Sequence, residues 1–415
     1  MIRTLEIFNL VIGVVFTLCY LHQFFYILVP WFRKRKKSEI PAGRNKIAVL
    51  ICARNEEVVI SGLIDSIHAQ TYPAELIDIF VLADNCTDRT ADIAASRGAH
   101  VYSRFNDELI GKGYAMKELR QHINEDYPDG FDAYIVVDAD NILSPNYVEE
   151  MNRTLSEGNH IITSYRNSKN FGDNWVSSGY ALWFIRESRY LNDSRDLLGI
   201  SCAVSGTGFL FDRTVADRLV DWPFHCLTED IEFTIDAVLR GERIAFCPNA
   251  ELYDEQPTSF RQSWNQRKRW TRGYLQVFRK YGTQLLKGIF VGKHKFSCYD
   301  MTMNNLPAFF LSTLSLICNI ALIIAYAAGG LPIGSLLLHL LGVLIPMYLL
   351  LVFLGAVPCI TEWKHIHTST AKKILAIFTF PLFPITFLPI AISSLFGKVV
   401  WKPIKHSVTM DGRKL

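Results

Sequence analysis

The chain has 415 residues, of which 50% are hydrophobic and 13% aromatic, while only 20% are charged. This composition is too apolar for a fully soluble protein of that size, and the length leaves room for a soluble domain plus several membrane helices. The formal net charge of +3 comes without a basic arm or an arginine-rich stripe, which argues against nucleic acid as the main partner. Nine cysteines include no close CxxC pair, so neither a zinc site nor a disulfide framework is indicated.

An almost uncharged apolar stretch near the start of the chain runs from Ile7 to Phe32. It is about as long as the roughly 20 residues that cross a bilayer, and Trp31 stands at its end, where interfacial aromatic residues are favoured. The basic run from Arg33 to Lys37 follows directly, as expected for a cytoplasmic anchor. We therefore expect residues 1–37 to form a transmembrane helix with a cytoplasmic flank. A cleaved signal peptide is the alternative, but this stretch is too long and its basic cluster follows it instead of preceding it.

Between residues 38 and 270, short apolar strands alternate with helical patterns, which is typical of an α/β domain. The expected strands include residues 47–51, 77–82 and 133–137. Each runs into polar residues at its end, namely Asn55 and Glu56, then Asp84 and Asn85, then Asp138-Ala139-Asp140. In an open parallel sheet, this is the edge where ligands bind.

Residues 271–304 mix basic and apolar side chains, with Tyr274, Val277, Tyr281 and Leu285 recurring at helical spacing. This pattern predicts amphipathic helices at a membrane interface, with an ordinary solvent-facing helix as the alternative. Three apolar segments follow within residues 305–415, at 306–328, 331–360 and 374–396. Each is long enough to span a bilayer.

The last apolar segment contains Pro381, Pro384 and Pro389, so we expect it to be kinked or re-entrant. The basic clusters place the α/β domain in the cytoplasm and the N-terminus outside. Four simple spans would then place the C-terminal tail outside, yet this tail carries Lys398, Lys402, Lys405, Arg413 and Lys414. Either the last segment returns without crossing or the tail departs from the charge rule, and the sequence leaves both open.

Asp138 and Asp140 form a pair of carboxylates one residue apart, where a strand gives way to a turn. Such a pair can hold Mg²⁺ or Mn²⁺, which prefer oxygen ligands and bridge carboxylates to a diphosphate; a surface turn is the alternative. Asp84 ends another strand, and Gly111-Lys112-Gly113 is expected as a flexible loop with one cation suited to phosphate. Taken alone, Lys112 is better explained as a solvated loop lysine, but together these groups predict a nucleotide pocket.

Two further motifs lie near the end of the α/β domain. Thr228-Glu229-Asp230 precedes a helical pattern at residues 231–240, so its carboxylates are expected near a helix N-terminus, where negative charge is stabilised. Asp230 is then a candidate general base for an acceptor hydroxyl, and helix capping by Thr228 is the alternative. Gln266-Arg267-Lys268-Arg269-Trp270 combines groups that pair with phosphate or stack on a sugar; an interfacial belt of basic and aromatic residues is the alternative.

In this order, the motifs resemble those of the processive, membrane-integrated family 2 glycosyltransferases, which include cellulose, chitin and hyaluronan synthases and bacterial poly-N-acetylglucosamine synthases. The resemblance covers Lys46 to about Trp270 and rests on four elements: Asp84 with its turn, Asp138-Ala139-Asp140, Thr228-Glu229-Asp230 and Gln266 to Trp270. It implies an α/β GT-A fold, a UDP-sugar or other nucleotide-sugar donor, and a multi-pass enzyme of the plasma membrane with a cytoplasmic catalytic domain.

The resemblance also implies a role for individual residues. Asp140 and Asp138 would hold the divalent metal with the donor diphosphate, Asp84 would contact the nucleoside and Lys112 the donor. Asp230, beside Glu229, would be the base of an inverting displacement, while Arg269 stabilises the leaving diphosphate and Trp270 lies next to the acceptor sugar. The remaining expected substrate-binding residues are Asn55, Glu56, Gly206, Thr207, Gly208, Gln266 and Arg267.

The chain departs from this family in three respects. Ala83 precedes Asp84 where the family often has a second aspartate, only one N-terminal span is evident, and the membrane region is small. We therefore carry two hypotheses for the acceptor: a growing glycan that is extended and translocated, which the Gln266 to Trp270 motif favours, or a lipid or lipid-linked acceptor that receives a single sugar. A non-catalytic transport or scaffold component is disfavoured, because a binding-only domain has no need of the base Asp230.

Overall fold

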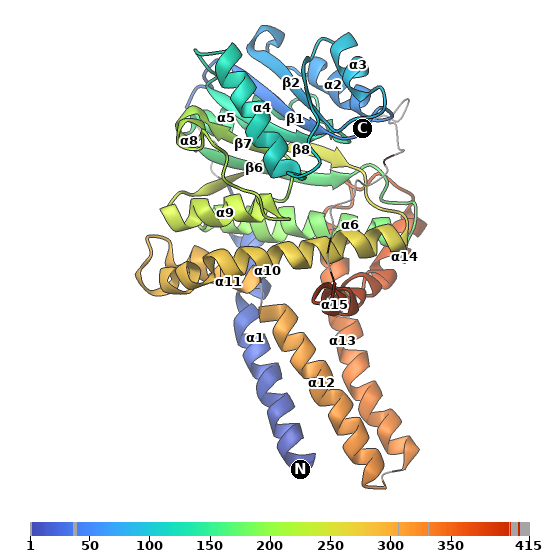
Figure 1. The fold of residues 1–415 in the computed structure, drawn as a ribbon. Coiled ribbons are helices and arrows are strands. Elements are labelled where there is room, and N and C mark those ends of the chain that lie inside the picture. Colours follow the sequence, from blue (N-terminus) through green and yellow to red (C-terminus); the bar gives the residue numbers. More distant parts are fainter. Residues whose placement is uncertain are drawn as a thin grey trace.

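A computed structural model describes residues 2–35, 40–305, 307–330, 332–397, 399 and 406. The end of the basic run after Arg33 and the basic residues of the C-terminal tail lie outside the described residues. The α/β domain forms one end of the molecule, a layer of helices lies beneath it, and three long helices project away from that layer (Figure 1).

An eight-stranded sheet forms the centre of the α/β domain, with strand order β3-β2-β1-β4-β7-β6-β8-β5. The strands are β1 (Ile47–Ala53), β2 (Ile77–Asp84), β3 (His100–Arg104), β4 (Ala133–Asp138), β5 (Ile142–Leu143), β6 (Ile161–Ser168), β7 (Phe209–Asp212) and β8 (Ile244–Asp254). The three strands expected from the sequence are present and parallel, as β1, β2 and β4. The sheet as a whole is mixed, because β7 runs antiparallel to both β4 and β6.

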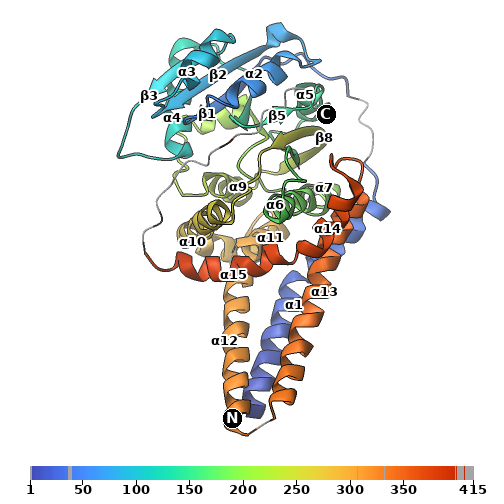
Figure 2. The same cartoon turned by 90° about the vertical axis from the view of Figure 1, so that its right-hand side faces the viewer.

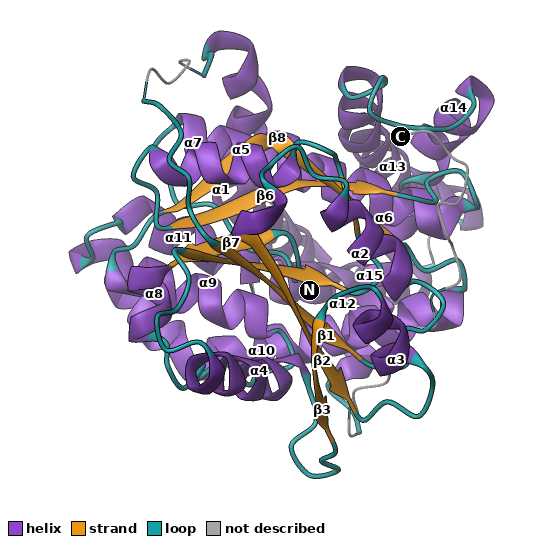
Figure 3. Cartoon of the chain, turned by 90° about the horizontal axis from the view of Figure 1, so that it is seen from above, coloured by secondary structure: helices purple, strands orange, loops and turns teal. Residues whose placement is uncertain are grey.

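Helices cover both faces of the sheet (Figure 3). One face packs against α2 (Ile60–His68), α3 (Thr90–Ser96) and α5 (Tyr147–Ser156), and the other against α4 (Lys112–Asp126), α8 (Arg213–Arg218) and α9 (Glu229–Arg240). In β1 the side chains alternate between these two cores, with Val49 on the first face and Leu50 on the second, both fully buried. Because both faces are covered, the strands read as continuous apolar runs.

A second layer of helices lies between the sheet and the long helices. It contains α6 (Trp175–Arg186), the π-helix η2 (Glu187–Asn192), α7 (Asp193–Leu197), α10 (Phe260–Val291) and α11 (Lys295–Asn305). The short 3₁₀ helix η1 (Ala74–Leu76) lies in the connection to β2. The helix α10 continues through Trp270, where the sequence suggested a domain boundary, and it buries Val277 and Leu285 as an amphipathic helix does.

Three described helices are long and apolar enough to cross a membrane: α1 (Ile2–Phe32), α12 (Pro307–Ala328) and α13 (Ile333–Thr361). α1 and α12 lie side by side (Figure 1). Asp300 of α11 connects α1 to the second layer of helices. It forms a buried ion pair with Arg195 of α7, whose Nε donates at 2.7 Å, and it accepts a hydrogen bond from Tyr26 Oη of α1 at 2.8 Å.

The proline-rich segment is broken into α14 (Thr370–Thr379) and α15 (Leu382–Ser394), which meet at a bend of 43°. The pair runs beneath the second layer of helices, across the direction of the long helices (Figure 2). Beyond it, Nδ1 of His406 lies 2.8 Å from Oε2 of Glu56 in the α/β domain. The chain at residue 406 is therefore on the same side as the α/β domain, as expected if the proline-rich segment returns without crossing.

Candidate active site

A cavity of about 500 Å³ lies between the edge of the sheet and the helices beneath it. Its upper wall is formed where β1, β2 and β4 end, at Arg54, Asp84 and Asp138. Its lower wall comes from α9 and α10 and, farthest from the sheet, from the apolar ends of α12 and α15. The cavity thus joins a polar sheet edge to helices with apolar surfaces.

At the polar end, Lys112 is paired with Asp138. Lys112 Nζ contacts Asp138 Oδ1 and donates a hydrogen bond to the carbonyl of Gly206 at 2.7 Å. Burial lowers the pKa of Lys112, but the charges of Asp138 and Glu229 outweigh it, so its pKa lies above the ordinary value and the amine stays charged. The prediction that Lys112 lies in a flexible loop was wrong, because Lys112 is the first residue of α4.

The glycine after Lys112 explains the position of this lysine. A Cβ on Gly113 would lie 1.9 Å from the carbonyl oxygen of Phe224, so no side chain fits there. Gly113 lets the first turn of α4 pack against this backbone, and Lys112 is fixed at the cavity wall.

Asp140 follows two residues after Asp138 and is 6% exposed. Its Oδ2 accepts a hydrogen bond from the backbone N–H of Glu255 at 2.9 Å. Burial acts to raise the pKa of this carboxyl, but the positive charges of His406 and Lys169 outweigh it, and the pKa lies below the ordinary value. Asp140 is therefore an anion at neutral pH.

The donor atoms of Asp138 and Asp140 suit a divalent metal. Both offer carboxylate oxygens at the cavity wall, and Mg²⁺ and Mn²⁺ take oxygen ligands while keeping several positions for substrate and water. Among the described residues, no cluster of three or more acidic, histidine or cysteine side chains could hold a metal. An ion at Asp140 and Asp138 would consequently take its other ligands from the donor diphosphate and water.

Glu229 and Asp230 are the first two residues of α9 and face the cavity. Thr228 precedes them, but its side chain does not cap the helix, so the capping interpretation is not realised in the structure. Burial raises the pKa of both carboxyls, and that of Glu229, which also feels the charge of Asp230, rises to about 7. Lys112 and Arg269 act to lower the pKa of both carboxyls, but the charge of Asp230 raises only that of Glu229, so Asp230 is the member of the pair that ionises first.

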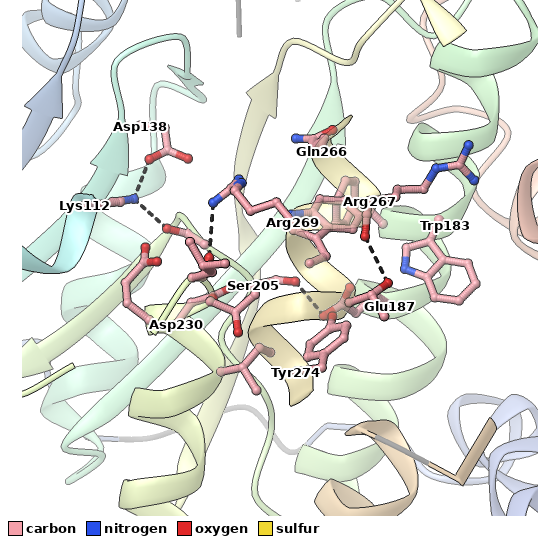
Figure 4. Close-up of a pocket in the computed structure, with 18 of the residues that line it drawn as sticks. Lys112, Asp138, Trp183, Glu187, Ser205, Asp230, Gln266, Arg267, Arg269 and Tyr274 are labelled. Carbon is pink, nitrogen blue, oxygen red and sulfur yellow. Dashed lines mark hydrogen bonds and ion pairs between the residues drawn. The ribbon is translucent and has the colours of Figure 1, made fainter. Parts of the chain in front are cut away.

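The motif on α10 divides between the cavity and the protein interior. Arg269 reaches toward Asp230 and donates a hydrogen bond to the carbonyl of Leu227 at 3.2 Å (Figure 4). Gln266 lines the cavity, as does Trp270, whose ring packs edge-on against Tyr180 with centroids 5.7 Å apart.

Arg267 is placed differently from its neighbours in the motif, because it is fully buried. Its Nη1 donates hydrogen bonds to the carbonyl of Phe383 at 2.7 Å and to Thr386 Oγ1 at 3.1 Å, and its guanidinium lies 4.6 Å from the Phe383 ring. It therefore joins α10 to α15 within the cavity wall, and its Nε and Nη2 have no hydrogen-bond partner among the described residues.

Asp84 lines the cavity, but its carboxylate is already engaged by Arg104, whose Nη1 donates to Oδ1 at 2.6 Å. Glu56 also lines the cavity and lies beside His406. Gly206 also lines the cavity. Three of the expected substrate-binding residues do not line it: Asn55, Thr207 and Gly208. Thr207 supports the site from behind, because its hydroxyl accepts a hydrogen bond from the backbone N–H of Asp138 at 2.9 Å.

The family match decides how this site is classified. The model of the family described as "Glycosyltransferase like family 2" matches residues 44–273. This range is more than half of the 415 residues and contains all four motifs of the α/β domain. The chain is a family 2 glycosyltransferase. The predicted family and the GT-A fold are therefore confirmed.

Similar proteins agree with this classification. The chain is 27% identical over 276 residues to the probable glycosyltransferase YdaM of Bacillus subtilis, which covers 62% of this chain and 61% of that protein. It is 25% identical over 291 residues to a beta-monoglucosyldiacylglycerol synthase of Nostoc, covering 68% and 59%, and 26% identical over 235 residues to a poly-beta-1,6-N-acetyl-D-glucosamine synthase of Staphylococcus aureus, covering 56% and 55%. The matched part thus spans only about three-fifths or less of each of these relatives.

Among solved structures, the mannosyltransferase PcManGT from Pyrobaculum calidifontis, in complex with GDP-Man and Mn²⁺, shares the fold with a TM-score of 0.60 at 14% identity. The likeness covers 94% of this chain and 99% of PcManGT, so it extends beyond the α/β domain into the other helices.

The structure of this glycosyltransferase adds cavity residues that the motifs did not indicate. Trp183 and Glu187, from α6 and the start of η2, and Tyr274 of α10 lie on the side of Asp230 away from Asp138 (Figure 4). Glu187 belongs to no recognisable spacing in the sequence, although the π-helix that begins at it is a feature often found at functional sites.

Proposed function

We propose that this protein transfers a sugar, with inversion, from a nucleotide sugar to a hydroxyl of an acceptor at the cytoplasmic face of the plasma membrane. One observation carries the proposal. A single cavity contains the Asp138 and Lys112 pair at one end, Asp230 and Arg269 in the middle, and the ends of two apolar helices at the other.

The residues suit a single in-line displacement. Asp230 takes the proton as the acceptor O–H bond breaks, and the oxygen forms its bond to the anomeric carbon of the sugar. The bond from that carbon to the diphosphate breaks, and its electron pair leaves with the nucleoside diphosphate. Arg269, close enough to lower the pKa of Asp230, stabilises the departing negative charge.

Asp140 and Asp138 are the residues that would hold a divalent cation beside the diphosphate. When bound, Mg²⁺ or Mn²⁺ supplies positive charge to the leaving group. This proposal is supported by the low pKa of Asp140 and by the Mn²⁺ named in the complex of PcManGT. Lys112 orients the same carboxylate of Asp138 and offers its one remaining hydrogen-bond donor to the donor sugar or phosphate.

For the acceptor, the cavity favours a membrane lipid or a lipid-linked molecule over a growing glycan. Ala308, Phe309 and Ser312 of α12, with Phe387 and Leu388 of α15, form the end of the cavity away from the sheet. An apolar mouth next to a span admits acyl chains. A glycan acceptor, extended and translocated, is the second candidate, supported by the Gln266 to Trp270 motif and by the poly-N-acetylglucosamine synthase relative.

The test is an assay of purified protein in lipid nanodiscs with UDP-glucose, UDP-N-acetylglucosamine and GDP-mannose in turn, each with Mg²⁺ or Mn²⁺. Released nucleotide and product mass are measured together. We expect one of the three nucleotide sugars to give both released nucleotide and a glycosylated acceptor. We expect Asp230→Asn to lose turnover but to keep its affinity for that nucleotide sugar, measured by titration. Asp221→Asn, which changes an exposed carboxylate, is the matched control. Normal turnover in Asp230→Asn would reject the assignment of the base.

A further inference from the structure

The two ends of the cavity differ in charge as well as in polarity. At the sheet edge, Lys112 and the guanidinium of Arg54 accompany the carboxylates of Asp138 and Asp84. Beyond Asp230, toward the apolar helices, the carboxylate of Glu187 projects from the start of η2 (Figure 4). The acceptor side of the cavity therefore begins with two acidic groups.

Glu187 is built into this wall and still reaches the cavity. Ser205 Oγ donates a hydrogen bond to Glu187 Oε1 at 2.8 Å, which leaves the second carboxylate oxygen for another donor. Burial and the nearby charge of Asp230 act to raise the pKa of Glu187, while Ser205 and Arg166 act to lower it, and the net direction is upward. A second negative charge beside these carboxylates is thus unfavourable.

The basic side chains described around the acceptor end are either paired with protein groups or buried in the cavity wall. Arg166 Nε donates to Asp254 Oδ2 at 2.7 Å. Arg267 is fully buried in the cavity wall, where its Nη1 donates to the carbonyl of Phe383 while its Nε and Nη2 have no hydrogen-bond partner among the described residues. Arg269 lies on the donor side of Asp230, where the leaving diphosphate is expected. An anionic head group entering from the membrane would meet the cavity-lining carboxylates of Glu187 and Asp230 at low dielectric, whereas the guanidinium of Arg166 is paired with Asp254 and that of Arg267 is fully buried.

We propose that the acceptor is a membrane lipid with an uncharged, hydroxyl-bearing head group, and that Glu187 binds this head group by accepting a hydrogen bond from a hydroxyl next to the one that Asp230 deprotonates. The inference rests on the proposed function and narrows its acceptor class. Tyr274 of α10 also lines the cavity, and in this proposal the acyl chains lie against Phe309 and Phe387. Lipids that carry a phosphate, polyprenyl phosphates among them, are excluded as acceptors by the same charges.

Competing acceptors in nanodiscs test the charge argument. Diacylglycerol and a monoglycosyl-diacylglycerol are the neutral probes. Phosphatidylglycerol carries the same two acyl chains and extra hydroxyls but one negative charge, polyprenyl phosphate is a second anionic probe, and a soluble oligosaccharide lacks the chains. We expect transfer to a neutral lipid with kcat/KM at least tenfold above that for either anionic lipid. Equal or faster transfer to an anionic lipid overturns the proposal.

The outcomes also separate this inference from the proposed function. Transfer to the soluble oligosaccharide alone, or donor hydrolysis without transfer to any lipid, overturns the lipid acceptor while sugar-transfer chemistry stands. Absence of nucleotide release with every donor is a failure of the proposed function itself.

Variants test the part assigned to Glu187. In Glu187→Gln we expect KM for the neutral lipid to rise about tenfold, the equivalent of one charge-assisted hydrogen bond. KM for the nucleotide sugar is expected to stay within twofold, and the preference for neutral over anionic lipid to shrink. Ser205→Ala leaves the Glu187 carboxylate in place, so we expect this variant to keep the preference for neutral over anionic lipid. If Ser205→Ala reproduces the loss of preference, or if Glu187→Gln leaves the preference unchanged, Glu187 has only a structural role and the assignment is wrong.

Discussion

Replacing Glu229 by glutamine is expected to stabilise the folded protein more at pH 8 than at pH 5.5. Burial and the charge of Asp230 raise the pKa of the Glu229 carboxyl from 4.5 to about 7. The folded protein therefore holds a proton that the unfolded chain releases at lower pH, and the free energy of unfolding of the wild type falls as the pH rises toward the folded pKa. Glutamine does not titrate, so the free energy of unfolding of Glu229→Gln does not fall with pH for this reason.

The magnitude follows from the same pKa. Between pH 5.5 and a folded pKa of about 7, the linkage amounts to about 2 kcal/mol, at about 1.4 kcal/mol for each pH unit. Because Glu229 shares its proton equilibrium with Asp230, we expect about half of this, ~1 kcal/mol. For a protein of 415 residues, with an unfolding entropy of about 2 cal/mol/K per residue, that corresponds to a change in Tm of about 1 °C.

The assay is thermal unfolding in detergent, followed by tryptophan fluorescence, for wild type and Glu229→Gln at both pH values. Glu157→Gln, which alters an exposed carboxyl at the end of α5, is the control and is expected to show the same Tm difference from wild type at both. We expect the Tm of Glu229→Gln relative to wild type to rise by about 1 °C from pH 5.5 to pH 8. A difference that is constant, or larger at pH 5.5, would refute the burial of this carboxyl pair.

Three other changes probe the base, the metal and the topology, and one probes the sheet edge. Asp230→Asn is expected to lower kcat by about 10²–10⁴ with little change in donor affinity, measured by steady-state kinetics and titration. Asp140→Ala is expected to abolish transfer and its stimulation by Mn²⁺ while leaving the Tm within a few degrees; transfer that survives would remove the metal assignment. Arg104→Gln, which strands the buried carboxylate of Asp84, is expected to destabilise the protein by about 3–5 kcal/mol, and an unchanged Tm would contradict the burial of that pair. A cysteine at Gly330, between α12 and α13, is expected to react with a membrane-impermeant reagent from the side opposite to one placed in the C-terminal tail, and labelling from the same side would reject three spans.

The parts of this structure that sequence could predict depend on local patterns. Continuous apolar runs predicted β1, β2 and β4, because strands covered on both faces show no alternation. The carboxylates of Asp138 and Asp230 could be placed at a strand end and a helix start, since each motif adjoins its own element. The prolines at 381 and 384 predicted the break between α14 and α15 for the same local reason.

What sequence could not predict depends on residues far apart in the chain. Arg104 pairs with Asp84 across adjacent strands, and His406 contacts Glu56 although the two residues are far apart in the sequence. No motif spacing predicts either contact. Lys112 was expected in a loop because glycines flank it, yet Gly113 serves close packing against Phe224 at the start of a helix. Glu187 emerged as a cavity residue only once η2, α9 and α10 were assembled around one space.

The anomeric configuration of the product tests the central claim most directly, because a single displacement by a hydroxyl that Asp230 activates must invert the sugar carbon. Proton NMR of the product made by purified protein from an α-linked nucleotide sugar resolves this configuration. We predict a β-linked sugar from the first turnover onward. An α-linked product, formed with retention, would contradict the displacement and the role assigned to Asp230.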